Sequence, residues 1–296
     1  MDPGEVQRTE RVEIGATPLF QIVGCSVTGE SHLARQRPGD DSFGMADDAN
    51  RLAVVVCDGA GSAAQGGRGA TFISQLLPAR LLEHWKAAGS DAFTNETAEA
   101  VIATALDAAR EELEKLAMQT GAAIADFNTT VVGLIAEGEL AAMFQIGDGA
   151  GGCFSRAAES ASWTETRVSA PDNGEYVNET SFLTSPNWRA NLRCSAVGGF
   201  EAALLVTDGV TPFALTRSQK NFDMAFADGL LSFMATHPPE AAAGALRNLL
   251  LRPDVLKVSD DDKTMVCVQR TGAPPAQTTR ESATEPDAAL LDNPWK

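Results

Sequence analysis

The sequence predicts an α+β fold in which mainly antiparallel β-sheets carry helices on their outer faces. Short apolar runs rich in Val, Leu and Ile indicate strands, and amphipathic stretches between them indicate helices that occur in pairs. Strands followed by a helix pair, and then strands followed by another helix pair, do not alternate as parallel βαβ units do. The helices are therefore expected to cover sheets rather than to connect parallel strands.

The predicted strands are short apolar runs rich in Val, Leu and Ile. They cover Phe20–Cys25, Leu52–Cys57, Thr129–Ile135, Ala141–Ile146, Gly151–Ser155, Ala202–Thr207 and Thr264–Val268.

The longest predicted helix runs from about Glu96 to Thr120, because its apolar residues recur on one face at helical spacing. Thr94 or Asn95 can cap its first turn with a side-chain oxygen. The other predicted helices cover residues 69–86, 220–234 and 239–251.

The composition limits both the class of protein and its partners. Apolar residues make up 44% of the 296 residues, and the net charge of −17 argues against nucleic acid or an anionic membrane as a partner. The start of the chain lacks the basic and apolar regions of a signal peptide, so we expect a cytoplasmic protein. We also expect it to be a monomer. We expect a polar N-terminal segment at residues 1–17, a folded domain at 18–270 and a disordered tail at 271–296.

The cysteines do not form a C-x-x-C pair, and most of them lie in apolar runs. In a cytoplasmic protein this placement predicts small buried side chains rather than disulfides or zinc ligands. They are Cys25, Cys57, Cys153, Cys194 and Cys267.

Aspartates recur where predicted strands end. Asp58, Asp148 and Asp208 each follow an apolar run and precede a glycine, while Asp40-Asp41 and Asp260–Asp262 form two further acidic groups. Asp-Gly is also ordinary turn chemistry, so one such pair alone would indicate only a turn. Several carboxylates at the edge of a buried core repel one another unless cations neutralise them. Oxygen ligands without His or Cys suit Mg²⁺ or Mn²⁺.

These segments resemble, in their order along the chain, those of the metal-dependent Ser/Thr protein phosphatases of type 2C, the PPM family. The stretches Ser31-His32 and 174–180 resemble the bacterial branch of that family. The resemblance spans about residues 20 to 270. The matching segments are Asp40-Asp41-Ser42, Val56-Cys57-Asp58-Gly59, Phe127-Asn128-Thr129-Thr130, Ile146-Gly147-Asp148, Val206-Thr207-Asp208-Gly209 and Asp261-Asp262-Lys263-Thr264.

The resemblance implies two central antiparallel sheets flanked by helix pairs, and an enzyme that hydrolyses phosphoserine and phosphothreonine on proteins. By the same analogy, Asp58 bridges two Mn²⁺ or Mg²⁺ ions and Gly59 offers its carbonyl to one of them. Asp208 and Asp261 bind the other ion. A hydroxide that bridges two such cations is a strong nucleophile near neutral pH.

Three further aspartates receive roles from the resemblance. Asp40 and Asp41 would act through metal-bound water, with Asp41 close to the reaction. Asp148 would help to hold a third, weaker ion, as in bacterial members of the family. The expected partner is a phosphoprotein in a signalling pathway, for example a Ser/Thr kinase or its target, and the sequence does not identify it.

The chain departs from the family at two positions. Many members have a His two positions after the bridging aspartate, where this chain has Ala60. His32 is then the histidine that could reach the site as a catalytic group, or it could be structural. The arginine that binds phosphate in the family has two counterparts here, Arg35 and Arg37, and neither is in perfect register.

A polar segment at residues 174–180 corresponds to the family's flap, so Glu175 and Asn178 are weaker candidates for substrate contacts. The alternative is a plain surface loop. Among rival functions, a haloacid-dehalogenase phosphatase needs Asp-x-Asp, and this chain has Ala60 in place of the second acid. A P-loop needs a Lys that the segment 147–152 lacks. A catalytically weak, phosphatase-like binding or regulatory module stays open as the alternative function.

Overall fold

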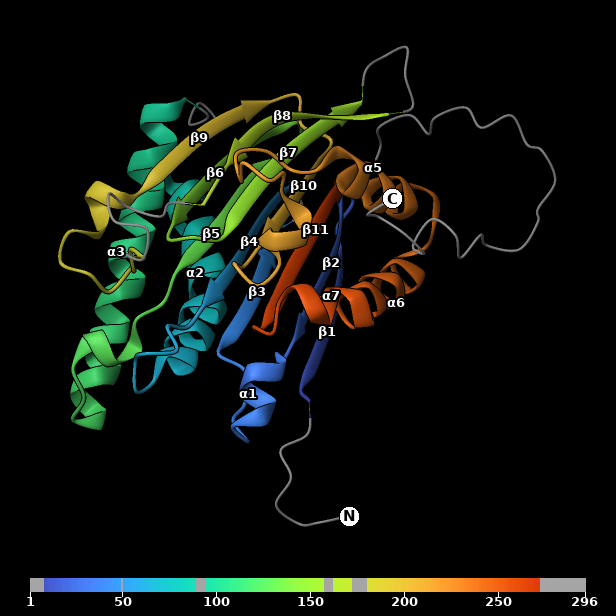
Figure 1. Ribbon diagram of the computed structural model, residues 1–296. Coiled ribbons are helices and arrows are strands. Elements are labelled where there is room, and N and C mark those ends of the chain that lie inside the picture. Colours follow the sequence, from blue (N-terminus) through green and yellow to red (C-terminus); the bar gives the residue numbers. More distant parts are fainter. Residues whose placement is uncertain (1–7, 49, 89–93, 157–161, 172–179, 272–296) are drawn as a thin grey trace, which may run out of the picture.

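The computed structural model describes residues 8–48, 50–88, 94–156, 162–171 and 180–271. They form two antiparallel sheets that lie face to face, with helices on each outer side (Figure 1). The predicted α+β fold is confirmed, including the two central sheets that the family resemblance implied. Residues 272–296, in which we expected a disordered tail, lie outside the described residues.

Within the described residues, one sheet has six strands in the order β1-β2-β11-β10-β7-β8, and the other has five in the order β3-β4-β5-β6-β9. All neighbouring strands pair antiparallel. The strands are β1 (Glu10–Ala16), β2 (Phe20–Val27), β3 (Asp41–Asp47), β4 (Arg51–Asp58), β5 (Val131–Glu137), β6 (Leu140–Ile146), β7 (Ala150–Arg156), β8 (Trp163–Ser169), β9 (Arg193–Gly198), β10 (Ala202–Val206) and β11 (Lys263–Arg270).

The helix pairs lie where the sequence predicts them. The first pair packs on the five-stranded sheet and the second on the six-stranded sheet (Figure 1). The first pair is α2 (Gly66–Ala88) and α3 (Asn95–Thr120), and the second is α5 (Met224–Thr236) and α6 (Pro239–Leu250). The short helices are α1 (Glu30–Ala34), α4 (Thr211–Ala214) and α7 (Pro253–Val258).

The ends of α3 have local causes. The backbone N–H of Thr97 donates to Thr94 Oγ1 at 3.2 Å, which satisfies one of the unpaired donors of the first turn. At the other end, Gly121 adopts a left-handed conformation with φ 68° and terminates the helix. Of the two caps that the sequence allowed, Thr94 is the one used.

The core has three apolar layers, one under each helix pair and one between the sheets. Alternate side chains of β4 belong to two of these layers. Val54 and Val56 face the other sheet, whereas Val55 and Cys57 face α2 and α3. Both faces of β4 are buried, so its sequence is a continuous apolar run.

Four strands of the structure were not predicted, and all four are edge strands: β1 and β8 in one sheet, β3 and β9 in the other. An edge strand has one neighbour and an exposed side, so it tolerates a polar sequence. Because β1 pairs with β2 along its whole length, the folded part begins before residue 18, and Glu10–Ala16 is a strand rather than part of a polar extension.

The five cysteines are free thiols, and four of them are buried, as predicted. Burial raises the pKa of the Cys153 thiol to about 12, so this thiol is unreactive at neutral pH. Within the described residues, every helix is too short or too polar to cross a bilayer.

Candidate functional site

Three aspartates from separate strand ends meet at one end of the two sheets. Asp58 ends β4, Asp148 lies in the turn between β6 and β7, and Asp208 follows β10. Each offers a carboxylate oxygen, and these oxygens lie within 4.8 Å of one another. With Asp261 they line a cavity of about 440 Å³. The structure thus brings together the three aspartates that the sequence placed at strand ends, and it adds Asp261 from the acidic group that precedes β11.

The carboxylates in this cavity disfavour each other's ionised form. Burial raises the pKa of Asp58 well above its usual range, and the charges of Asp41 and Asp208 raise it further. Burial, followed by the charges of Asp148 and Asp261, raises the pKa of Asp208 to about 7. Bound cations would remove this repulsion and allow all the carboxylates to ionise at neutral pH.

The oxygens of Asp148 fit a cation site. Asp148 Oδ2 accepts a hydrogen bond from Thr180 Oγ1 at 2.7 Å. Asp148 Oδ1 is buried and accepts no hydrogen bond from any described residue. A buried carboxylate oxygen without a donor needs a partner, and here it lies beside two other carboxylates. An all-oxygen donor set of this kind suits Mg²⁺ or Mn²⁺.

A buried glutamine holds the turn that carries Asp148. Gln145 Nε2 donates to the carbonyl of Gly147 at 3.0 Å and to the carbonyl of Gly149 at 2.6 Å. Gly147 has φ 109°, a backbone conformation that residues other than glycine rarely adopt. Gln145 was not among the predicted site residues, because a single polar residue inside an apolar run carries no distinctive signal.

The backbone of Asp58 is fixed by two threonines that precede β5. The N–H of Asp58 donates to Thr130 Oγ1 at 3.1 Å, and the carbonyl of Asp58 accepts from Thr129 Oγ1 at 3.0 Å. Next to it, a Cβ on Gly59 would lie 2.3 Å from the backbone carbon of Gly66. Position 59 therefore requires glycine for α2 to begin against it.

Asp41 lies directly opposite Asp58 in the pairing of β3 with β4. It accepts a hydrogen bond from Thr207 Oγ1 at 2.7 Å, which joins the two sheets at the site. Burial raises the pKa of Asp41 well above its usual range, and the charge of Asp262 adds to the effect. Asp40 is buried, and its N–H donates to Asp262 Oδ2 at 2.5 Å.

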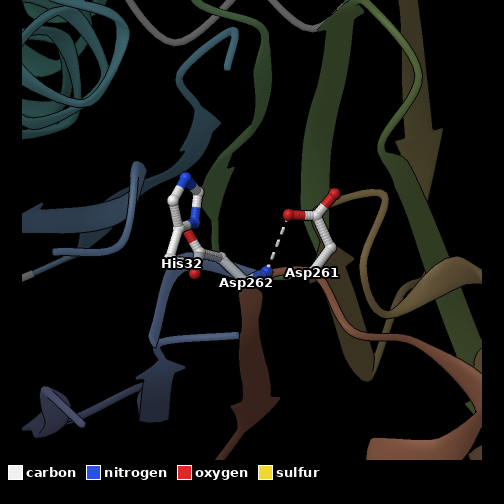
Figure 2. A group of neighbouring side chains, drawn as sticks. All are labelled: His32, Asp261 and Asp262. Carbon is white, nitrogen blue, oxygen red and sulfur yellow. Dashed lines mark hydrogen bonds and ion pairs between the residues drawn. The ribbon is translucent and has the colours of Figure 1, made fainter. Parts of the chain in front are cut away.

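His32 lies between two buried carboxylates. Its Nε2 is 3.3 Å from Asp40 Oδ2, and its Nδ1 is 3.0 Å from Asp262 Oδ2. Figure 2 shows His32 with Asp261 and Asp262, and the dashed line marks the Asp262 N–H that donates to Asp261 Oδ1 at 2.9 Å. Because Asp262 also accepts from the N–H of Gly29 at 2.7 Å, it is a structural acid, whereas Asp261 faces the cavity.

The two arginine candidates are separated by the structure. Arg35 lines the cavity of the carboxylates, whereas Arg37 lines a second groove. Between them Gln36 has φ 54°, and the N–H groups of Gln36 and Arg37 donate back to Leu33 and His32, which ends α1. Glu175 and Asn178, the candidates for substrate contacts, lie outside the described residues.

Comparison with known proteins identifies the same family that the motifs containing the site aspartates resemble. The model for protein phosphatase 2C matches residues 28–250. Serine/threonine-protein phosphatase 3 of Escherichia coli (strain K12) is 28% identical over 256 residues, which is 83% of this chain and 96% of that protein.

Two solved structures have a similar fold. The serine-threonine phosphatase 2C from Toxoplasma gondii has a TM-score of 0.62 at 12% identity, covering 90% of this chain and 99% of that chain. RsbX in complex with magnesium has a TM-score of 0.52 at 13% identity, covering 88% of this chain and 100% of that chain. Since the family model spans most of the chain and the aspartates of its motifs meet in one cavity, the chain belongs to the protein phosphatase 2C family and is a metal-dependent protein serine/threonine phosphatase.

Proposed function

We propose that this phosphatase hydrolyses phosphoserine and phosphothreonine on proteins with two Mn²⁺ or Mg²⁺ ions bound at the strand ends. The observation that carries the proposal is the meeting of Asp58, Asp148 and Asp208 within 4.8 Å in one cavity. The relative from Escherichia coli is named a serine/threonine-protein phosphatase, and RsbX was solved with magnesium. The first description supports the substrate class that we propose for this chain, and the second supports the ion.

Separate residues would bind the two ions and the phosphate. Asp58 would contact both ions, Gly59 would contribute its carbonyl, and Asp208 and Asp261 would hold the second ion. When bound, the ions supply a nucleophilic hydroxide near neutral pH and offset the charge of the phosphoryl group. Arg35 lines the same cavity and would bind the phosphate oxygens with its planar guanidinium.

The remaining carboxylates would support this core. Asp41, opposite Asp58, and the buried Asp40 would hold water molecules of the coordination shell. Asp148 would hold a third ion that binds more weakly. His32 would position the site rather than transfer a proton, because both of its ring nitrogens already face carboxylates.

The test is a phosphatase assay on phosphopeptides that carry Ser, Thr or Tyr phosphate, with Mn²⁺ and with excess EDTA. Turnover on the Ser and Thr peptides should require Mn²⁺. The Asp58→Asn variant should lose at least about a hundredfold in kcat, because several kcal/mol of charge stabilisation depend on the ions. Asp47→Asn, at the opposite end of the β3–β4 pair, is the matched control and should keep full activity.

Full turnover in EDTA would exclude the metal mechanism. Mn²⁺ binding without turnover on any of the peptides or on a chromogenic phosphate ester would favour a phosphatase-like binding module instead. Calorimetric titration with Mn²⁺ on the same samples separates these two outcomes.

A further inference from the structure

A groove of about 640 Å³ lies beside the catalytic cavity, and Asp40 forms part of its wall. The loop at residues 37–40 and the first turns of α2 line it, together with Leu116 of α3. We propose that this groove binds an acidic side chain, or a second phosphate, that lies near the phosphorylated residue of the substrate. The inference rests on the proposed function, to which it adds a preference for acidic phosphoprotein segments.

The charge of the groove is opposite to that of the chain. Arg37 and Arg68 enter it from different walls, in a protein whose net charge is −17. The side chain of Arg37 is 45% exposed, and its guanidinium lies 3.8 Å from Asp40 Oδ2, which is beyond hydrogen-bonding distance. An ion pair at that distance leaves the five N–H donors of the guanidinium available to an anion.

The second arginine is held at the edge of the groove. The guanidinium of Arg68 lies over the ring of Phe127, 5.6 Å from its centre, and donates to Gln65 Oε1. Arg68 belongs to the first turn of α2, whose positive end faces the groove through Gly66 and Gly67. That turn, all of it within the described residues, carries no acidic side chain. Two arginines and a helix end thus present positive charge to the same space.

The rest of the lining suits a peptide rather than a bare ion. Phe72 and Leu116 give the groove an apolar part, and both side chains are half-buried. The volume lies within the roughly 300–1,000 Å³ of ligand pockets. An extended segment of substrate could therefore pack its aliphatic atoms there while its acidic group meets Arg37 and Arg68.

The groove and the catalytic cavity are close enough for one peptide to occupy both. Ser62 lines the cavity, and Ala64, two residues later, lines the groove. Two residues span at most about 7 Å, which is also the reach of two residues of extended substrate. The acidic group should therefore lie about two to four positions from the phosphorylated residue.

The experiment compares phosphothreonine peptides that differ only at these flanking positions, which carry Glu, phosphoserine or Gln. Wild-type enzyme with Mn²⁺ should show a kcat/KM about threefold to tenfold higher for the Glu peptide than for the Gln peptide, mainly through KM. Arg68→Gln should lose most of this preference. Arg80→Gln, a matched change further along α2 at an arginine that pairs with Glu83, should keep it.

A chromogenic phosphate ester should be turned over equally by wild type, Arg68→Gln and Arg80→Gln, since it does not reach the groove. The preference should shrink as salt is raised, because the arginines are exposed. A higher kcat/KM for the phosphoserine flank than for Glu would assign the groove to a second phosphate, and equal values would assign it to carboxylates. An equal Glu preference in wild type and Arg68→Gln would overturn the proposal.

Failure of the proposed function would look different. A wild-type enzyme that turns over no phosphopeptide contradicts the proposed function. Peptide binding measured by fluorescence anisotropy then shows whether the groove prefers an acidic group. Tighter binding of the Glu peptide to wild type than to Arg68→Gln supports the groove, whereas equal binding overturns it.

Discussion

At the scale of single residues, the turn that carries Asp148 depends on a side chain that never reaches the cavity. Gln145 is fully buried in β6, and its amide donates to the carbonyls on both sides of Asp148. The Asp148 carboxylate is held separately by Thr180. Groups that orient a metal ligand from behind commonly change metal affinity or activity by about 10–100-fold. We therefore treat Gln145 as a positioning residue for Asp148.

Replacement of Gln145 by Met keeps the volume of the side chain and removes both donated hydrogen bonds. We expect about a tenfold loss of turnover on phosphopeptides, together with weaker binding of the last Mn²⁺ in a calorimetric titration. The control is Gln269→Met, which replaces another buried glutamine, at the end of β11 that lies away from Asp261. This variant should change neither quantity. If Gln145→Met matches wild type in both measurements, then the turn is held without the glutamine.

At the scale of secondary-structure elements, α2 lies unusually close to β3. A Cβ on Gly44 of β3 would lie 1.9 Å from the carbonyl oxygen of Ser74 in α2. The same contact brings Ser74 Oγ within 2.9 Å of Ser42 Oγ, to which it donates. Because α2 also begins against Gly59, the distance between this helix and its sheet is set by glycines at both contacts.

A methyl group at position 44 should force α2 away from the sheet. We expect Gly44→Ala to lower the free energy of unfolding by about 1–3 kcal/mol, the usual cost of overpacking. Gly244→Ala is the control, since its Cβ would meet nothing within 4 Å in α6, and helix propensity favours Ala there by about 1 kcal/mol. Urea unfolding of both variants measures the difference, and equal stabilities would show that α2 can shift freely.

At the scale of the whole molecule, the site lies where the ends of the two sheets meet. Asp58 belongs to the five-stranded sheet, Asp208 follows a strand of the six-stranded sheet, and Asp148 lies in the turn that links the two. Without cations, these charges repel across the junction of the sheets. Bound ions would instead join the sheets, so metal should stabilise the fold as well as enable catalysis.

The stability of the metal-free protein should consequently fall as pH rises. Asp208 has a pKa of about 7 in the folded protein and about 3.9 when unfolded, so the folded state binds the proton more tightly. Its stabilising effect is complete below pH 4 and is lost as pH rises through 7. For Asp208 alone the loss between pH 5 and pH 8 is about 3 kcal/mol.

Thermal unfolding in EDTA at pH 5 and pH 8 measures this effect. Asp208→Asn should unfold at a higher temperature than wild type at pH 8 in EDTA, and should gain less from Mn²⁺. A metal-free protein that is equally stable at both pH values would show that the carboxylates do not repel one another in the folded state.

Much of the fold could be predicted from the sequence because its interior strands are buried on both faces. The seven predicted strands are all interior strands of the two sheets, whereas the four that were missed are edge strands. The sequence of β8, for example, is mostly polar, because one side of this strand has no neighbouring strand. Its position can be recognised only when β7 is present to pair with it.

The sequence by itself determined the acidic character of the site, because it places a carboxylate at or just after the end of three strands that are buried in the sheets. Asp58, Asp148 and Asp208 are such residues, and they meet as predicted. The tertiary structure alone decided which neighbouring residues serve the site. Arg35 and Arg37 differ by two positions, yet the turn at Gln36 sends one to the cavity and the other to the groove. The physical reason is that burial and strand pairing leave a pattern in composition, whereas the direction of a loop side chain depends on contacts with residues distant in the sequence.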